Sequence, residues 1–235
     1  MARAPVPPAA DSTAPPRPSA LTAYRLRLGL VAAPELSAVR PSQLAAPGRN
    51  VGLQLDYRLG RRWHLSVAYL QTVKRYVARG TDYSPPAYYV PLRTWRIDGV
   101  AADCRIVDVP LNLRYDLWQR PRYQVFASAG LSSLLMQREA YTYTYEQVSG
   151  RNRPAETVEV RTNARHVGQI LNLSAGFEHA VGQRWSVQAE PFVKLPLGGI
   201  GFGDVRLGSA GVFLSLRYGL WPVRAGTPAV GAAGR

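Results

Sequence analysis

The chain has 235 residues and a formal net charge of +14, and 46% of its residues are hydrophobic. This length allows one large domain or two small ones, and no unbroken apolar run is long enough for a transmembrane helix. The 29 Lys and Arg residues are scattered rather than clustered, and no zinc-finger or RNP-like motif is present, which argues against nucleic acid as a partner.

Both ends of the chain differ in composition from its middle. Residues 1–21 are rich in Pro and Ala, and we expect a disordered or extended linker there. Because this segment lacks the roughly 7–15-residue apolar core of a secretory signal, we expect a mature fragment, a mis-assigned start or the last domain of a longer protein. The predicted folded domain covers residues 22–221, and residues 222–235 form a predicted flexible tail.

Between these ends the hydrophobicity alternates with a period of two residues, which predicts β-strands. Each strand has one apolar and one polar face. Most of them are longer than the about 5–6 residues of soluble strands, and they suit the roughly 9–11 residues that cross a bilayer on a tilt. The eight predicted strands cover residues 24–30, 51–59, 63–69, 107–117, 123–131, 171–178, 185–195 and 209–218.

Short and long connections alternate between the predicted strands. The tight turns are at residues 60–62, 118–120 and 180–182. The long connections cover residues 34–48, 80–103, 137–163 and 196–206. Because neighbouring strands are antiparallel and their number is even, the long loops leave one end of the sheet, and the short turns and both termini lie at the other.

Aromatic residues gather on the apolar face beside the short turns. The predicted membrane-interface aromatics are Tyr24, Tyr57, Trp63, Tyr115, Tyr123, Phe177, Trp185 and Tyr218. Tyr and Trp at one level are typical of a membrane interface, since their rings are apolar in body and polar at the tip. An apolar face in lipid requires a closed sheet, because backbone groups cannot stay unpaired in a bilayer. The predicted fold is an all-β, eight-stranded antiparallel up-and-down transmembrane β-barrel with long extracellular loops.

The polar faces would then fill the barrel, whose interior is just wide enough for side chains when there are eight strands. Charges of both signs occur at similar depth on these faces, and we predict a buried ion-pair network. Its predicted members are Asp56, Arg58, Arg114, Asp116, Glu178, Glu190 and Arg217. Buried charges are tolerated when each has a partner, so we interpret the network as structural filling rather than an ion path.

Three segments of the sequence resemble a known family. The segment Val109–Tyr115, which reads VPLNLRY, resembles the "IPLxLRY" strand of PorT-like outer-membrane β-barrel domains of Bacteroidota. The segment 127–131 with the tyrosines that follow, and the closing run 196–220, are similar to the same family. The resemblance covers about residues 21–220. It implies an OmpA-like barrel in the bacterial outer membrane, with periplasmic termini and extracellular loops.

The same resemblance implies a role in secretion or envelope assembly, although many members have no known activity. In some relatives a barrel of this kind follows a membrane helix and a proline-rich linker, which residues 1–21 resemble. One departure concerns the end of the chain. Outer-membrane barrels usually end on an aromatic residue, whereas this chain continues past Tyr218 and Trp221.

We predict a non-enzymatic protein that acts through its extracellular loops. We expect it to be a monomer surrounded by outer-membrane lipid, with a protein or a glycan as partner at the loops. Anionic lipid or glycan would also account for the basic charge. The loop aromatics that suggest such contacts are Tyr83, Tyr88, Tyr89, Trp95, Tyr141, Tyr143 and Tyr145. The alternative is that these aromatics belong to strand extensions and to an upper interface belt.

The sequence predicts no catalytic residues, no cofactor and no metal site. Cys104 is the only cysteine, so no intramolecular disulfide is possible, and we expect it to be a passive residue near a strand start. The three histidines are not spaced as a metal motif. The Gly-Ile-Gly-Phe-Gly run at 199–203 lacks the Lys-Ser/Thr and the helix of a phosphate-binding loop, which indicates a flexible outer loop.

Two other functions remain open at this point. A membrane-embedded lipid hydrolase would need a Ser/His/acid set, and His166, with Ser133 and Glu139 on the neighbouring strand, is the only set that can be assembled. No local motif supports it. A soluble lipocalin-like ligand-binding barrel would have the faces inverted, with the apolar face inside. The alternation by itself is compatible with that barrel, but the ring of aromatics argues against it.

Overall fold

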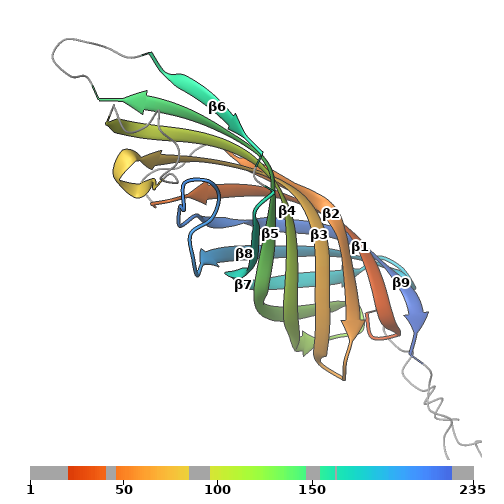
Figure 1. The fold of residues 1–235 in the computed structure, drawn as a ribbon. Coiled ribbons are helices and arrows are strands. Elements are labelled where there is room, and N and C mark those ends of the chain that lie inside the picture. Colours follow the sequence, from red (N-terminus) through yellow and green to blue (C-terminus); the bar gives the residue numbers. More distant parts are fainter. Residues whose placement is uncertain (1–20, 41–45, 85–95, 147–153, 162, 224–235) are drawn as a thin grey trace, which may run out of the picture.

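The computed structural model describes residues 21–40, 46–84, 96–146, 154–161 and 163–223, so most of the predicted linker and tail lie outside the described part. The described residues form one antiparallel sheet of nine strands with a short 3-10 helix (Figure 1). Among them, no helix has the length and apolarity needed to cross a membrane. The elements are β1 (Tyr24–Ala38), β2 (Gly48–Arg58), β3 (Trp63–Arg79), η1 (Gly80–Asp82), β4 (Ile97–Gln119), β5 (Tyr123–Tyr145), β6 (Glu156–Val160), β7 (Arg165–Ala180), β8 (Trp185–Pro196) and β9 (Gly208–Pro222).

Eight of these strands close into a barrel. β1 pairs with β2 on one side and with β9 on the other, and β4 pairs with both β3 and β5, so the ring runs β1-β2-β3-β4-β5-β7-β8-β9. Leu30, for example, faces Leu53 on β2 and Leu216 on β9. The prediction of an eight-stranded antiparallel barrel is confirmed. The short turns, the start of β1 and the end of β9 lie at one end of it (Figure 1).

The polar faces of the strands point into the barrel and the apolar faces point outward. On β1, the Arg27 side of the strand is buried, whereas Leu30 on the other face is 62% exposed. β9 repeats this arrangement, with Arg217 buried and Leu214 exposed. The lipocalin-like alternative is therefore wrong, because it needs an apolar interior.

Three barrel strands continue well past the ends of the others. β4 and β5 have 23 residues each, compared with 11 in β2. With β6 and the end of β3 they form an extension of the sheet that projects from the end opposite the short turns (Figure 1). The prediction of loops at residues 80–103 and 137–163 is wrong where β4, β5 and β6 occupy these ranges, and β6 was not predicted.

The alternation inverts where β4 leaves the barrel. In the barrel, Asp108 and Arg114 point inward and Leu111 points outward. In the extension, the apolar Cys104 is buried on the inner face and Asp103 is exposed on the outer face. An inverted pattern of this kind is typical of a sheet with one face in water and the other on a core. The predicted strand 107–117 begins at this inversion, whereas β4 begins at Ile97. Cys104 therefore lies inside β4 and not near its start.

The connection between β8 and β9 supplies the core of the extension. Ile200 and Val205 form a β-bridge, and the Phe202 ring packs on the Tyr141 ring with centroids 6.3 Å apart. Gly203 approaches Tyr83 so closely that a Cβ at this position would lie 2.0 Å from its ring. We call the resulting cluster the apolar cap; its residues are Tyr76, Ala78, Tyr83, Val100, Ala102, Cys104, Ile106, Leu134, Met136, Tyr141, Tyr143, Ile170, Ile200, Phe202, Val205 and Leu207.

Closure of the barrel at the β1–β9 seam can be tested by cross-linking. Leu30→Cys combined with Leu216→Cys should form a disulfide on mild oxidation, because directly paired strand positions lie within the about 4.4–6.8 Å that a disulfide spans. Leu30→Cys combined with Leu173→Cys on β7 is the matched control and should stay reduced. Mass spectrometry of the digested protein measures both, and equal cross-linking of the two pairs would contradict the seam.

Candidate functional site

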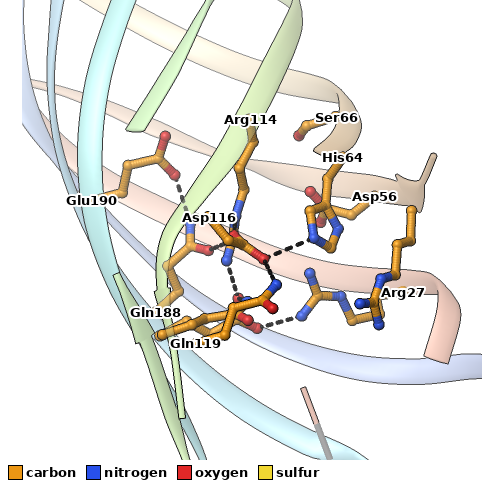
Figure 2. A network of polar contacts seen from close by, with 12 residues as sticks. Arg27, Asp56, His64, Ser66, Arg114, Asp116, Gln119, Gln188 and Glu190 are labelled. Atoms are coloured by element: carbon orange, nitrogen blue, oxygen red, sulfur yellow. Dashed lines mark hydrogen bonds and ion pairs between the residues drawn. The ribbon is translucent and has the colours of Figure 1, made fainter. Parts of the chain in front are cut away.

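Glu178 on β7 is the centre of a buried cluster of charges inside the barrel, part of which is drawn in Figure 2. Its carboxylate accepts hydrogen bonds from the guanidinium groups of Arg27 at 2.8 Å, Arg114 at 2.8 Å and Arg217 at 3.3 Å. Ser186 donates a further bond at 2.6 Å. The three arginines come from β1, β4 and β9, so one carboxylate links four strands across the interior.

Asp116 and Asp56 balance the remaining positive charge of this cluster. Asp116 accepts from Arg114 Nε at 3.0 Å and lies 2.9 Å from His64 Nε2. Asp56 forms an ion pair with Arg217 at 3.3 Å. These side chains are all at most 2% exposed, so water contributes little to their solvation and the partners must replace it.

The structure joins five of the seven predicted network residues by these contacts: Asp56, Arg114, Asp116, Glu178 and Arg217. Glu190 is connected through Gln188, which accepts from Arg114 at 2.9 Å and donates to Glu190 at 2.5 Å. Arg58 lies apart, since it is the last residue of β2. Its guanidinium donates to the backbone carbonyl oxygens of Gly60 at 2.8 Å and of Arg61 at 2.9 Å, and thus holds the turn.

Arg27, His64 and Gln188 belong to this cluster but were not predicted from the sequence. The available signal was position, because each of them lies on the polar face of a predicted strand, and every second residue of a barrel strand points inward. Gln188 is two residues before Glu190, and His64 faces Arg114 across the β3–β4 pairing. Which polar residues of different strands meet depends on the stagger of the strands, which the alternation does not give.

A second polar layer lies between the Glu178 cluster and the apolar cap. Glu35 on β1 forms an ion pair with Lys74 on β3 and accepts a hydrogen bond from Asn50 at 2.8 Å. On the other side of the barrel, Lys194 forms an ion pair with Asp108. The sequence reading missed this layer, because Glu35 and Lys74 lie beyond the ends of the strands that it predicted.

The interior leaves almost no free space. A cavity of about 20 Å³ lies beside Asp56, Arg114 and Arg217, which is room for about one water molecule. Above the Glu35 layer, Leu134, Leu207 and other cap residues fill the barrel mouth with apolar side chains. The interior is therefore filled by charges that are fixed in ion pairs, and the described residues contain no group of three or more His, Cys, Asp or Glu that could hold a metal ion.

The predicted interface aromatics lie at the short-turn end of the barrel. Trp63 packs on Tyr115 and Trp185 packs on Tyr218, with ring centroids 4.7 and 4.8 Å apart. Tyr123 and Phe177 stack at 5.9 Å, and Arg25 lies 5.4 Å from the centre of the Tyr57 ring. Trp118 and Trp221 are more than 60% exposed at the same end. They were not among the predicted interface aromatics, because the sequence places Trp118 in a turn and Trp221 at the end of the folded domain.

Tyr24 lies at a different level from its predicted partner Tyr218. A register irregularity near the start of β1 sets Tyr24 against Pro222, whereas Tyr218 faces Leu28. The Tyr24 ring lies over Gly219, where a Cβ would come within 2.3 Å of it. Closure of the barrel therefore brings the two tyrosines to the same end but not side by side.

The residues of the candidate hydrolase set have other partners. His166 Nδ1 lies 3.2 Å from Gln169 Oε1, and His166 Nε2 accepts a hydrogen bond from the backbone N–H of Gly201 at 3.2 Å. Ser133 Oγ accepts from the backbone N–H of Gly168 at 3.1 Å. A nucleophilic serine must donate its proton to the histidine, and these contacts occupy the histidine with backbone and amide groups instead.

The tyrosines that were predicted to contact a partner are largely inside the extension. Tyr141 and Tyr143 are 0% exposed, and Tyr83 is 5% exposed. The Tyr83 and Tyr143 hydroxyls lie 2.6 Å apart, and burial raises the pKa of the Tyr83 phenol. Tyr88, Tyr89 and Trp95 lie outside the described residues. The alternative that Tyr141 and Tyr143 belong to strand extensions is the one that the structure supports.

Comparison with solved structures finds similarity to small outer-membrane barrels. The chain is similar to Neisserial surface protein A, with 15% identity and a TM-score of 0.48 over 84% of this chain and 99% of that one. It is also similar to Ail, the attachment invasion locus protein of Yersinia pestis, with 11% identity and a TM-score of 0.43 over 83% and 99% of the two chains. At these identities the likeness concerns the fold and not the function.

A third similar structure is the outer membrane protein OprG from Pseudomonas aeruginosa, with 9% identity and a TM-score of 0.38. The alignment covers 85% of this chain and 98% of that one. No family model and no curated protein sequence matches the chain. Its function must therefore be argued from its own residues.

The Glu178 cluster predicts a large effect of a small substitution. Glu178→Gln leaves three buried arginines without their shared counter-charge, and we expect the free energy of unfolding to fall by about 3–5 kcal/mol. Glu159→Gln is the matched control, since Glu159 pairs with Arg138 at the surface, and it should leave the free energy of unfolding nearly unchanged. Urea unfolding of the refolded barrel measures both. Equal effects would show that the buried cluster is not a stabilising element.

Proposed function

We propose that this protein is a non-enzymatic β-barrel of the bacterial outer membrane. In this proposal the barrel does not conduct ions, and the sheet extension lies outside the cell. The observation that carries the proposal is the inversion of the alternation along β4, from apolar-out in the barrel to polar-out in the extension. A strand of this kind suits two surroundings, with lipid around its lower part and water around its upper part.

The length of the apolar-out segment supports a membrane span. On β4 the apolar outward positions run from Val107 to Leu117. Ten steps of about 3.4 Å give about 34 Å along the strand, or about 26 Å along the barrel axis at a tilt of about 40°. This height is close to the roughly 25 Å apolar band of outer-membrane barrels, and the short-turn aromatics lie at its lower edge.

The two ends of the barrel support one orientation. The turns at one end are short, and the strands at the other end continue into the extension, as in outer-membrane barrels with short periplasmic turns and long extracellular segments. The proposal therefore places both termini in the periplasm and the apolar cap at the cell surface. It also keeps residues 22–221 as the folded domain and the flanking segments as linker and tail.

We further propose that the extension presents a surface to a protein or a glycan. With Tyr83, Tyr141 and Tyr143 in the cap, the outward face of the extension is charged and hydroxyl-bearing, and its ion pair between Arg75 and Asp103 is solvent-exposed. The PorT-like resemblance of Val109–Tyr115 adds a role in secretion or envelope assembly as the finer proposal. Basic charge over the whole chain, +14, favours an acidic partner.

The predicted absence of ion conduction can be tested with the purified barrel. After refolding in detergent, the unboiled protein should run faster on a gel than the boiled protein, and planar bilayers that contain it should show no discrete conductance. Arg114→Ala should lower the free energy of unfolding by about 3–5 kcal/mol and still show no conductance, because the Glu35 layer and the apolar cap remain. A stable Arg114→Ala barrel with an open pore would contradict the sealed interior.

The orientation is tested by labelling intact cells. Glu159→Cys places a thiol on the extension and Arg61→Cys places one at a short turn, and both positions are exposed. A maleimide too large to pass outer-membrane pores should label only the first. The single native cysteine, Cys104, is buried and serves as the unlabelled background. Labelling of Arg61→Cys but not of Glu159→Cys would reverse the proposed orientation.

A further inference from the structure

Arginines mark the upper edge of the apolar band on one side of the barrel. Arg49 on β2 faces Val73, Val73 faces Arg105 on β4, and Arg105 faces Arg138 on β5, so these residues form one outward row across four strands. Arg165 begins β7 nearby and faces Leu135. Below the row most outward side chains are apolar, with the exposed Gln71 on β3 as an exception, and above it the exposed Arg75–Asp103 pair begins the water-facing part of the extension.

An open groove lies directly below this row. It has a volume of about 520 Å³ and runs over the outer face of β3, β4, β5 and the start of β7. Part of its lining is apolar, and the rest carries the amide groups of Gln137 and Asn163 and the guanidinium group of Arg165. The lining residues are Tyr69, Val107, Val109, Leu135, Met136, Gln137, Asn163 and Arg165. Arg105 lies two residues above Val107 on the same face of β4, at the upper rim.

The arginines of the rim need a counter-charge. Arg105 and Arg138 face each other directly on neighbouring strands, an arrangement of like charges that destabilises a sheet. Glu159 pairs with Arg138. Among the described residues, no ion pair is formed by Arg105 or by Arg165, and both side chains are exposed. An anion that binds at this rim would relieve the repulsion at little desolvation cost.

We propose that this groove binds an outer-leaflet lipid, with its anionic phosphate headgroup between Arg105 and Arg165 and its acyl chain along Tyr69, Val109 and Leu135. The position at the edge of the apolar band selects a molecule with one charged and one apolar end, because a free anion would leave the apolar part of the groove uncovered. Arg49 continues the row and attracts the same headgroups. This inference rests on the proposed membrane location of the barrel.

The probe is dioleoyl phosphatidic acid, titrated into the barrel in an uncharged detergent and counted by native mass spectrometry. Dioleoylglycerol is the matched lipid without phosphate, and inorganic phosphate is the matched anion without acyl chains. Arg105→Gln combined with Arg165→Gln should weaken phosphatidic acid binding about 30-fold, and Arg165→Gln alone about 5-fold. Arg61→Gln combined with Arg120→Gln removes two exposed arginines from the other end of the barrel and should change binding less than 2-fold.

Three results would overturn the inference. One is binding of dioleoylglycerol as tight as that of phosphatidic acid. Another is displacement of phosphatidic acid by inorganic phosphate at equal concentration, which would leave the apolar wall without a role. The third is a loss of binding in the short-turn variant but not in the rim variants. All variants must first show the gel shift of the folded barrel; failure of the wild-type protein in that assay would refute the membrane barrel itself rather than the lipid site.

Discussion

An eight-stranded barrel leaves an interior that only side chains can fill, and in this chain the interior is charged. Glu178 binds Arg27, Arg114 and Arg217 from three other strands, so strands that are not neighbours in the sheet are tied through one carboxylate. Each of these charges is costly to bury alone and tolerable only with its partners. The cluster therefore stabilises the stagger of the strands that brings these charges together.

The same constraint leaves little free space along the axis of the described barrel. The Glu178 cluster, the layer of Glu35 and Lys74, and the apolar cap follow one another along the axis, and the cavity of about 20 Å³ beside Arg217 is too small for a water-filled path. The function that we propose therefore lies on the outside of the molecule. There the strands offer an apolar band, a rim of arginines that includes Arg105, and a polar extension built on β4 and β5.

Much of this arrangement could be predicted, and the errors have physical causes. The alternation predicted the eight barrel strands and the inward side of Arg114 and Glu178, because one apolar face and one polar face leave only two assignments. It missed β6 and the upper parts of β4 and β5, because the apolar face changes sides near Ile106. The prediction of Tyr141 as a surface residue is wrong for the same reason, since its ring is fully buried in the cap.

The sequence by itself determined that the chain forms strands with two unlike faces, that short and long connections alternate, and that aromatic residues gather beside the short turns. These are local properties, which depend on residues two or three positions apart. Only the tertiary structure decided which charges meet, that residues 200–205 fold into the cap, and that Arg58 holds a turn instead of joining the Glu178 cluster. Such contacts join residues up to 161 positions apart, as between Asp56 and Arg217, and they are set by the stagger of the closed ring.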